Sequence, residues 1–524
     1  MLDVIVIGAG FSGLCALHRL RGLGMSALVL EAGDGVGGTW YWNRYPGARC
    51  DSESYYYSFS FDDDLQQEWR WSERYPAQPE VLAYLDHVAD RFDLRRDIRL
   101  GTAVTSATFD GGWTVRTESG ERLRAKFLIT AVGCLSSANV PELPGLDAFA
   151  GDWYHTGRWP HEDVDFTGLR VGVIGTGSTG IQAIPVIAER AAHLTVFQRT
   201  PNFSVPARNA PLDEEFQARV RAEYDEIRAL QRETGNGHPF RISPRNALEC
   251  TAEERREVYE AAWQRGGLRF RATFNDLLSS EDANDTAAEF IRGKIREVVR
   301  DPEIAERLLP RDHPFAAKRP PIDTGYFETY NRDDVALVDL RETPIVEVTR
   351  EGLRTTSGEH RLDALVFATG FDAMTGPLLR IDIRGTGGTL AEKWRDGPRG
   401  YLGLQVAGFP NLFTITGPGS PSVLTNMPTS IEQHVDWIAR CLEHMRRNGF
   451  HRIEATEEAE RDWGREVREA ADRTLLPKAE SSWYLGANVP GKPRVFMPYA
   501  GGLAHYAALC DQAAHNDYAG FHLT

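Results

Sequence analysis

Three glycines near the start of the chain have the spacing of a turn that binds a dinucleotide. The run GAGFSG places Gly8, Gly10 and Gly13 between the apolar stretch VIVI and a helical pattern of apolar residues. In such a unit the first glycine permits the tight turn, the second lets the backbone approach a pyrophosphate, and the third lets the helix pack on the strand. Glu31 ends the next apolar run, where a carboxylate accepts hydrogen bonds from a ribose. We therefore expect a dinucleotide site at residues 3–31.

A second run with the same spacing, GTGSTG, predicts another dinucleotide site. Its glycines are Gly175, Gly177 and Gly180, but the strand-like run that follows, LTVFQRT, ends in Arg199 and Thr200 rather than in an acid. An acidic residue would repel a 2′-phosphate, whereas guanidinium and hydroxyl groups bind one. The second site should therefore prefer NADPH to NADH.

The loop after Glu31 is longer and richer in aromatic residues than a site for NAD alone needs. Its sequence, GDGVGGTWYWNRYPGARCDSESYYYSFSF, is rich in glycine and in aromatic residues. Flat rings beside a closely approaching backbone suit an isoalloxazine. We therefore expect FAD in the first unit and NADPH in the second, with electrons passing from NADPH to the flavin.

Composition and charge limit the remaining classes. The 524 residues, 42% of them hydrophobic, are typical of a globular chain of two or three domains. A net charge of −16 without a Lys/Arg-rich run argues against nucleic acid, and no apolar run is long enough for a membrane span. Nothing removable precedes VIVIG, so we expect a cytoplasmic protein. The six cysteines form no Cys-x-x-Cys pair, which argues against a redox dithiol and a metal site.

The order of the patterns predicts an α/β protein with two Rossmann-like dinucleotide-binding domains and a helical insertion. Charged, helix-periodic runs fill the part of the chain after the second glycine turn, and strand-like runs return at 364–370 and 411–417. The expected division is a discontinuous FAD-binding domain at 1–140 and 385–524, a linker at 141–160, an NADP-binding domain at 161–208 and 316–384, and a helical insertion at 209–315.

The expected linker contains FAGDWYHTGRWP (149–160), which resembles the F-x-G-x-x-x-H-x-x-x-W-P fingerprint of type I Baeyer–Villiger monooxygenases. GGTWYWNRYPGARCD (37–51) and LVFATGFD (365–372) resemble two further signatures of that family. GPGSPSVLTNMP (417–428) resembles the active-site loop of its phenylacetone and steroid monooxygenase branch. In the family the fingerprint fixes the linker while the NADP domain moves. The fingerprint residues are Phe149, Gly151, His155, Trp159 and Pro160.

The resemblance implies a flavin-dependent monooxygenase. NADPH would reduce FAD, the reduced flavin would capture O₂ as a C4a-peroxide, and the peroxide would convert a ketone into an ester or lactone, with sulfoxidation as a second activity. Arg319, in the run KRP, matches the essential arginine of the family, and Asp51 matches the carboxylate that pairs with it. The partners would be O₂ and a small ketone, and the chain would be a monomer.

The resemblance also assigns residues to the cofactors and to the substrate. The FAD contacts would be Gly8, Gly10, Ser12, Gly13, Glu31, Thr39, Trp40, Asp51, Tyr57, Val104 and Met427. The NADP contacts would be Arg49, Gly175, Thr176, Gly177, Ser178, Thr179, Gly180, Arg199, Thr200, Lys318, Arg319 and Trp483. The ketone pocket would be lined by Val423, Leu424 and Met427.

Two other functions remain open. A flavin monooxygenase that hydroxylates nitrogen or sulfur shares both glycine runs, but its fingerprint ends in Tyr or Phe where Trp159 stands, and it normally lacks the arginine of KRP. A non-enzymatic NADPH-binding sensor would retain Arg199 but would need neither Arg319 nor Asp51. A disulfide reductase of the same fold is excluded in its usual form, because the chain has no Cys-x-x-Cys pair.

Overall fold

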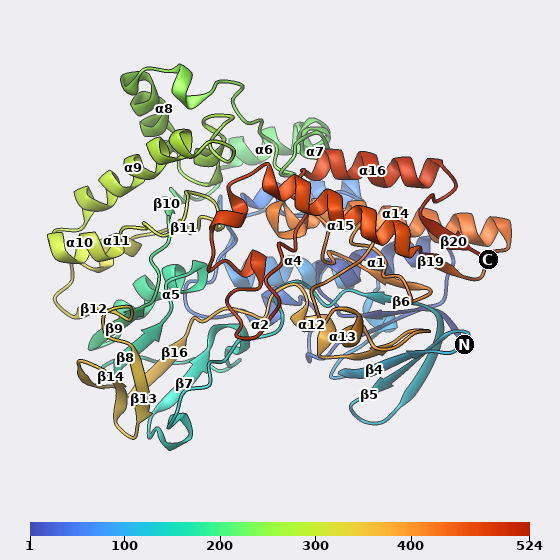
Figure 1. Ribbon diagram of the computed structural model, residues 1–524, viewed down its shortest axis with the longest axis horizontal. Coiled ribbons are helices and arrows are strands. Elements are labelled where there is room, and N and C mark those ends of the chain that lie inside the picture. Colours follow the sequence, from blue (N-terminus) through green and yellow to red (C-terminus); the bar gives the residue numbers. More distant parts are fainter.

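The computed structural model describes residues 1–524 and contains two large β-sheets, each with helices packed on it, together with a helical region (Figure 1). Parallel strands form all of one sheet and the centre of the other, and a glycine turn and a helix follow one central strand of each. The expected α/β fold with two Rossmann-like units is therefore confirmed.

The first sheet has the strand order β17-β4-β5-β6-β1-β2-β3, and β18 adds to β6. The central strand β1 (Leu2–Ile7) pairs in parallel with β2 and β6 and is buried at Val4–Ile7, as expected for a strand covered on both faces. The other strands are β2 (Ala27–Leu30), β3 (Ile98–Arg99), β4 (Val104–Phe109), β5 (Trp113–Thr117), β6 (Arg122–Thr130), β17 (Asp382–Arg384) and β18 (Leu412–Thr414).

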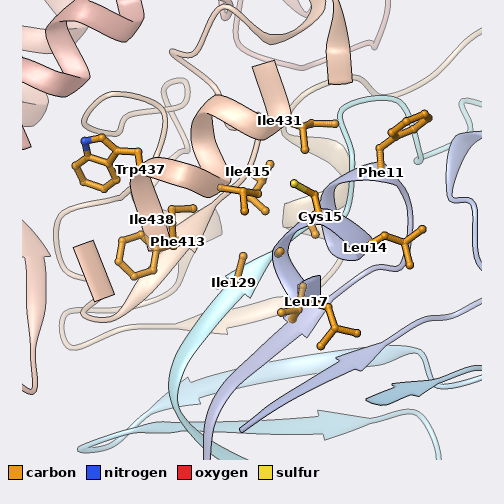
Figure 2. Packing of buried hydrophobic residues seen from close by; sticks show 14 of the residues in the cluster. Phe11, Leu14, Cys15, Leu17, Ile129, Phe413, Ile415, Ile431, Trp437 and Ile438 are labelled. Atoms are coloured by element: carbon orange, nitrogen blue, oxygen red, sulfur yellow. The ribbon is translucent and has the colours of Figure 1, made fainter. Parts of the chain in front are cut away.

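Helix α1 (Phe11–Gly22) packs between this sheet and α14 (Met427–Asn448). Figure 2 shows side chains of α1, β6 and α14 gathered in one apolar cluster, with Cys15 among them. Burying each aliphatic side chain contributes roughly 1.5–3 kcal/mol. Other helices of this half are α2 (Thr39–Trp42), α3 (Asp63–Glu68), α4 (Gln78–Arg91), α12 (Gly376–Leu379), α13 (Leu390–Lys393), α15 (Glu457–Asp472) and α16 (Leu503–His515).

The second sheet has the order β12-β9-β8-β16-β7, and all of its strands are parallel. Strand β7 (Asp152–His155) lies within the segment 141–160 and forms an edge of this sheet beside β16. The other strands are β8 (Arg170–Ile174), β9 (His193–Gln198), β12 (Val335–Asp339) and β16 (Ala364–Phe367), and α5 (Ser178–Ala188) follows β8. A separate antiparallel sheet contains β13 (Ile345–Thr349), β14 (Gly352–Thr355) and β15 (Gly358–Arg361).

Helices fill most of the region between β10 and β11 (Figure 1). Polar residues define where several of them begin: Thr251 forms a capping box with Glu254, and Ser280 and Asp301 cap the next two helices. These helices are α6 (Glu214–Ala222), α7 (Tyr224–Glu233), α8 (Ala252–Arg265), α9 (Glu281–Val298) and α10 (Pro302–Leu308).

Short strand pairs close the fold. β10 (Val205–Pro206) pairs with β11 (Ile322–Asp323), which returns the chain from the helical region close to Arg319, and α11 (Tyr326–Thr329) follows. β19 (Ile453–Ala455) pairs with β20 (Phe521–Leu523) near the C-terminus. None of the helices combines the length and the apolar character needed to cross a bilayer.

The chain passes between the two large sheets twice, at 131–151 and at 368–381, and these two passages are hydrogen-bonded to each other. The amide of Asn139 donates to the carbonyl of Gly370 at 3.0 Å, and the amide of Asp372 donates to the carbonyl of Ser137 at 2.8 Å. Thr369 Oγ1 also donates to the Asn139 carbonyl, at 2.6 Å.

Candidate active site

The first glycine turn is built so that no side chain can occupy it. Gly8 has φ +104°, and an added Cβ there would lie 2.5 Å from the carbonyl oxygen of Ala131. A Cβ on Gly13 would lie 1.8 Å from the carbonyl oxygen of Gly8. Gly10 precedes α1 without any side-chain cap, so the first amides of that helix are left for a ligand.

Glu31 stands beside this turn, as the sequence predicts. Its carboxylate accepts hydrogen bonds from the amides of Ala9 at 2.7 Å and Gly33 at 2.8 Å. Burial raises the pKa of Glu31, and these amides oppose the rise. The carboxylate is therefore fixed at the end of β2, where the hydroxyls of an adenosine ribose would meet it.

Aromatic residues of the expected flavin loop meet next to α1. Trp40 Nε1 donates to the hydroxyl of Tyr57 at 3.3 Å, and the ring centroid of Tyr57 lies 5.3 Å from that of Phe11. Asp51 lies on the same loop and follows the buried Cys50. The loop thus places flat rings and a carboxylate beside the first glycine turn.

The second glycine turn repeats the first. A Cβ on Gly175 would lie 2.5 Å from the carbonyl oxygen of Ala368, and a Cβ on Gly180 would lie 2.1 Å from that of Gly175. A Cβ on Gly177, by contrast, would meet no atom within 4 Å, so the protein itself does not require a glycine there. A ligand that approaches the backbone closely does require one, so this turn fits a bound pyrophosphate.

Two cations lie close to the end of β9. Neither Arg199 nor Lys318 has an ion pair or a side-chain hydrogen bond within the protein. Burial lowers the pKa of Lys318, and the nearby charge of Arg199 lowers it further while Asp312 opposes the change. Two unpaired neighbouring cations favour an anion between them, as the 2′-phosphate of NADPH would be.

Arg319 and Asp51 form an ion pair, although 267 residues separate them in the sequence. Arg319 Nε lies 2.6 Å from Asp51 Oδ2, and Nη2 lies 3.0 Å from Oδ1. Burial alone would raise the pKa of Asp51, but the guanidinium outweighs it and lowers that pKa. Burial likewise opposes the charge of Arg319, but Asp51 raises its pKa above the usual value. Both groups therefore stay charged.

A cavity opens on one side of Arg319. Its walls come from the helical region, from the segment around Arg319, from the loop before α14 and from the C-terminal part of the chain. His238 lies in this wall, stacked on Phe240 with ring centroids 5.3 Å apart. Burial, and then the charge of Arg319, lower the pKa of His238 to about 3, so this imidazole is neutral at neutral pH. No carboxylate lines the cavity.

Of the residues predicted to line a ketone pocket, one lines this cavity and the others do not. Leu424 lines it directly. The carbonyl of Val423 accepts a hydrogen bond from Arg319 Nη1 at 3.1 Å, while its side chain is buried. Met427 begins α14, and Trp483 packs edge-on against Tyr484 with ring centroids 4.4 Å apart. Of the two aromatic residues, Tyr484 faces the cavity.

The other predicted contacts are placed as follows. Arg49 donates to Glu73 at 2.8 Å and to the carbonyl of Tyr75, so its guanidinium already has partners within the protein. Thr176 Oγ1 donates to the carbonyl of Thr200 at 3.0 Å, which ties the second glycine turn to the end of β9. The remaining residues lie in the first turn of α1 (Ser12), the start of α2 (Thr39), the start of β4 (Val104) and the first turn of α5 (Ser178, Thr179).

The fingerprint residues hold the linker and lie outside the cavity. A Cβ on Gly151 would lie 2.1 Å from the carbonyl oxygen of Asp363. His155 Nδ1 accepts from the Gly157 amide at 3.0 Å, and its Nε2 lies 3.3 Å from Thr369 Oγ1. Burial lowers the pKa of His155 to about 4. Trp159, just before Pro160, is buried against Tyr154, and Phe149 packs beside the apolar cluster of the second sheet.

Comparison with known proteins decides the family. A protein named Baeyer-Villiger monooxygenase from Pseudooceanicola batsensis is 48% identical over 96% of this chain and 93% of its own length. This chain belongs to the Baeyer–Villiger monooxygenases. The model of the pyridine nucleotide-disulphide oxidoreductases matches residues 5–234 of this monooxygenase, although its six cysteines are all free and buried.

Other relatives and solved structures agree with this assignment. A steroid monooxygenase solved with NADP is 55% identical to this monooxygenase, with a TM-score of 0.95 over 100% of this chain and 99% of that one. The structure titled OTEMO complex with FAD and NADP is 43% identical, with a TM-score of 0.97 over the same shares. Phenazine N-monooxygenase from Lysobacter antibioticus is 45% identical over 99% of this chain and 96% of its own length.

Sequence reasoning missed several residues of the cavity. His238, Arg271 and Tyr484 line it with Arg319, but no motif contains the first two. Tyr484 directly follows Trp483, so that neighbour was the one available indication.

Proposed function

We propose that this chain uses NADPH, FAD and O₂ to insert one oxygen atom beside a ketone carbonyl, and that it forms an ester or a lactone. The reaction converts ketone, O₂, NADPH and a proton into ester, NADP⁺ and water. The observation that carries the proposal is the partly buried ion pair of Arg319 and Asp51. The pair joins the loop after the first glycine turn to the segment that follows the helical region, and Arg319 also lines the cavity.

The two glycine turns fit the two cofactors. The turn at Gly8–Gly13, together with Glu31, Trp40 and Tyr57, would hold FAD, and the turn at Gly175–Gly180 would hold NADPH. When bound, FAD accepts a hydride from NADPH and, once reduced, reacts with O₂, chemistry that no side chain supplies. Arg199 and Lys318 would hold the 2′-phosphate.

Arg319 would stabilise negative charge that develops on a ketone oxygen in the cavity. Its guanidinium keeps its proton because Asp51 raises its pKa. Hydrogen bonds from Arg319 to Asp51 and to the Val423 carbonyl fix its orientation before a substrate arrives. A fixed, partly buried cation is the arrangement that stabilises such charge most effectively. Asp51 therefore acts on the reaction by orienting Arg319.

The remaining assignments belong to the same proposal. Met427 and Trp483 would approach the bound cofactors, and Val423 and Leu424 would shape the ketone site. The division into an FAD domain, a linker, an NADP domain and a helical insertion, the monomeric state and the cytoplasmic location stay predictions from the sequence.

Oxidation of a ring nitrogen is a second candidate, because one relative is named a phenazine N-monooxygenase. Trp159 and Arg319 favour the ketone reaction, since the sequence patterns of hydroxylating flavin enzymes differ at both positions.

The test is turnover of the purified holoenzyme with NADPH and ¹⁸O₂ on phenylacetone, thioanisole and phenazine, with products identified by mass. Benzyl acetate that contains one ¹⁸O atom is the expected result. Formation of a phenazine N-oxide without any ester would favour the second candidate. No oxidation of NADPH and no yellow flavin would instead indicate a sensor.

A further inference from the structure

Arg271 is a second cation in the cavity beside Arg319. It lies on the short 3-10 helix Leu268–Ala272 of the helical region, and its guanidinium has no hydrogen bond or ion pair within the protein. Arg319, by contrast, is paired with Asp51.

The short helix sends its side chains in different directions. Arg269 lies over the ring of Phe240 at 4.6 Å and is 3.7 Å from Glu53. Phe270 is buried between Tyr259 and Phe315, with ring centroids 5.5 Å away from each. Arg271 is the residue of this helix that brings a charge to the cavity, because Leu268 and Ala272 are its only other residues in the wall.

The ionisable groups around the cavity leave one positive charge without a counterion. Asp51 balances Arg319, and His238 is neutral because burial and Arg319 lower its pKa to about 3. Burial raises the pKa of Tyr484, so its phenol is also neutral. The other phenol in the wall, Tyr499, donates to Glu466 at 3.0 Å, and no Asp or Glu lines the cavity.

This charge lies in surroundings that disfavour it. Burial lowers the pKa of Arg271, with Arg319 adding to the effect and Tyr484 opposing it. A guanidinium keeps its proton in proteins, so this partly desolvated charge remains until an anion pairs with it. Phe240, Ile242 and Leu278 line the same cavity and suit a hydrocarbon chain.

We propose that Arg271 binds the carboxylate of a keto acid, so that the preferred substrates carry an anionic group on the same chain as the ketone carbonyl. The hydroxyl of Tyr484 has no partner in the protein and offers a second donor near Arg271. Arg319 would face the carbonyl while Arg271 faces the carboxylate, and the apolar wall would hold the carbons between them. This inference rests on the proposed oxidation of ketones.

The experiment compares levulinate and its longer oxo-acid homologues with their methyl esters, which share the carbon skeleton but carry no charge. The holoenzyme should have a kcat/KM at least about tenfold higher for the best acid than for its ester. In Arg271→Leu this advantage should fall about 10- to 100-fold, with the ester within about threefold of wild type. Arg271→Lys should recover part of it, because an ammonium keeps the charge but loses the bidentate geometry.

Arg256→Leu is the matched control, since it removes one exposed arginine from α8 in the same helical region. Calorimetric titration of the oxidised holoenzyme with the best acid, without NADPH, adds a reading of binding that does not depend on turnover. Weaker binding in Arg271→Leu than in Arg256→Leu is expected.

Three results would overturn the inference. The first is an equal kcat/KM for acid and ester in the wild type, while phenylacetone is still oxidised; the proposed function would then stand without this specificity. The second is an equal loss for acid and ester in Arg271→Leu together with a higher KM for NADPH, which would assign Arg271 to the cofactor. The third is no oxidation of any ketone, which would remove the proposed function as well.

Discussion

Arg319 is held from two directions, by the carboxylate of Asp51 and by the carbonyl of Val423. A side chain with four rotatable bonds is thereby fixed in one orientation, and the cost of ordering it is met during folding. The charge that faces the cavity is therefore already in place when a ketone binds.

Replacing Arg319 by alanine should separate the two halves of the reaction. Reduction of the flavin by NADPH should continue, while ester formation falls at least about 100-fold because a fixed donor to the ketone oxygen is lost. Anaerobic rapid mixing reports the first step, and gas chromatography of benzyl acetate reports the second. Arg256→Ala serves as the control, and ester formation at the wild-type rate in Arg319→Ala would remove this residue from the mechanism.

Arg199 offers a test of the cofactor preference. With this guanidinium gone, Lys318 alone would face the 2′-phosphate, so the KM for NADPH should rise about 10- to 100-fold. The KM for NADH, which has no such phosphate, should stay within about threefold. Steady-state kinetics of Arg199→Ala with both cofactors gives the comparison. Equal losses with NADPH and NADH would mean that Arg199 does not contact the 2′-phosphate.

At the scale of the elements, a glycine-to-alanine substitution should affect ligand binding at one position and stability at another. Gly177→Ala places a methyl group where no protein atom lies within 4 Å, so thermal unfolding of the apoprotein should be unchanged while NADPH binds more weakly. Fluorescence titration with NADPH measures the affinity, and a thermal melt of the apoprotein without NADPH measures the stability. Unchanged affinity for NADPH would show that nothing approaches this turn closely.

Gly151→Ala should lower the stability instead. The added Cβ would lie 2.1 Å from the carbonyl oxygen of Asp363, which directly precedes β16. Strand β7 must therefore shift away from the start of β16. Overpacking of this kind costs about 1–3 kcal/mol. A lower midpoint in urea is expected, with Gly22→Ala as the control because a Cβ there meets nothing within 4 Å. An unchanged midpoint would mean that the linker adjusts without cost.

The strand–turn–helix units could be predicted because their pattern is local. The apolar run VIVI, the three glycines and the helical spacing of apolar residues follow one another directly in the sequence. The ion pair of Arg319 and Asp51 could be expected only from the family resemblance. Strand β7 could not be predicted from DWYH, because it exists through pairing with β16, over 200 residues away. Arg271 and Tyr484 were missed for the same reason, since folding alone brings them beside Arg319.

At the scale of the whole molecule, three buried histidines should make the protein sensitive to acid. The pKa is lowered to about 4 for His155 and to about 3 for His238 and His434, with burial as the largest cause in each. Each pKa lies below the value near 6.5 in the unfolded chain, so below that pH the unfolded chain binds protons that the folded protein does not. The free energy of unfolding should therefore fall as the pH is lowered from about 6.5 towards 4. Each histidine contributes a loss of up to about 1.4 kcal/mol per pH unit.

His434 lies away from the cavity and allows this to be measured. Its Nδ1 accepts from the Thr416 amide at 2.9 Å, and its side chain is fully buried, so His434→Gln should lower stability at pH 7. The further loss between pH 7 and pH 5 should nevertheless be smaller than in the wild type, by about 1–2 kcal/mol. Urea unfolding at both pH values gives the difference, with the exposed His522→Gln as the control. The same loss in all three proteins would exclude His434 as a source of acid sensitivity.

The two passages between the sheets, hydrogen-bonded at Asn139 and Gly370, have a mechanical consequence. Chain connections that lie far apart would resist any relative rotation of the two units, whereas connections bound side by side act as a single hinge. Rotation of the second unit about the line of these two passages is therefore the relative motion that would stretch neither of them. His155 contacts these passages through Thr369, so the fingerprint lies beside the line about which such a rotation would take place.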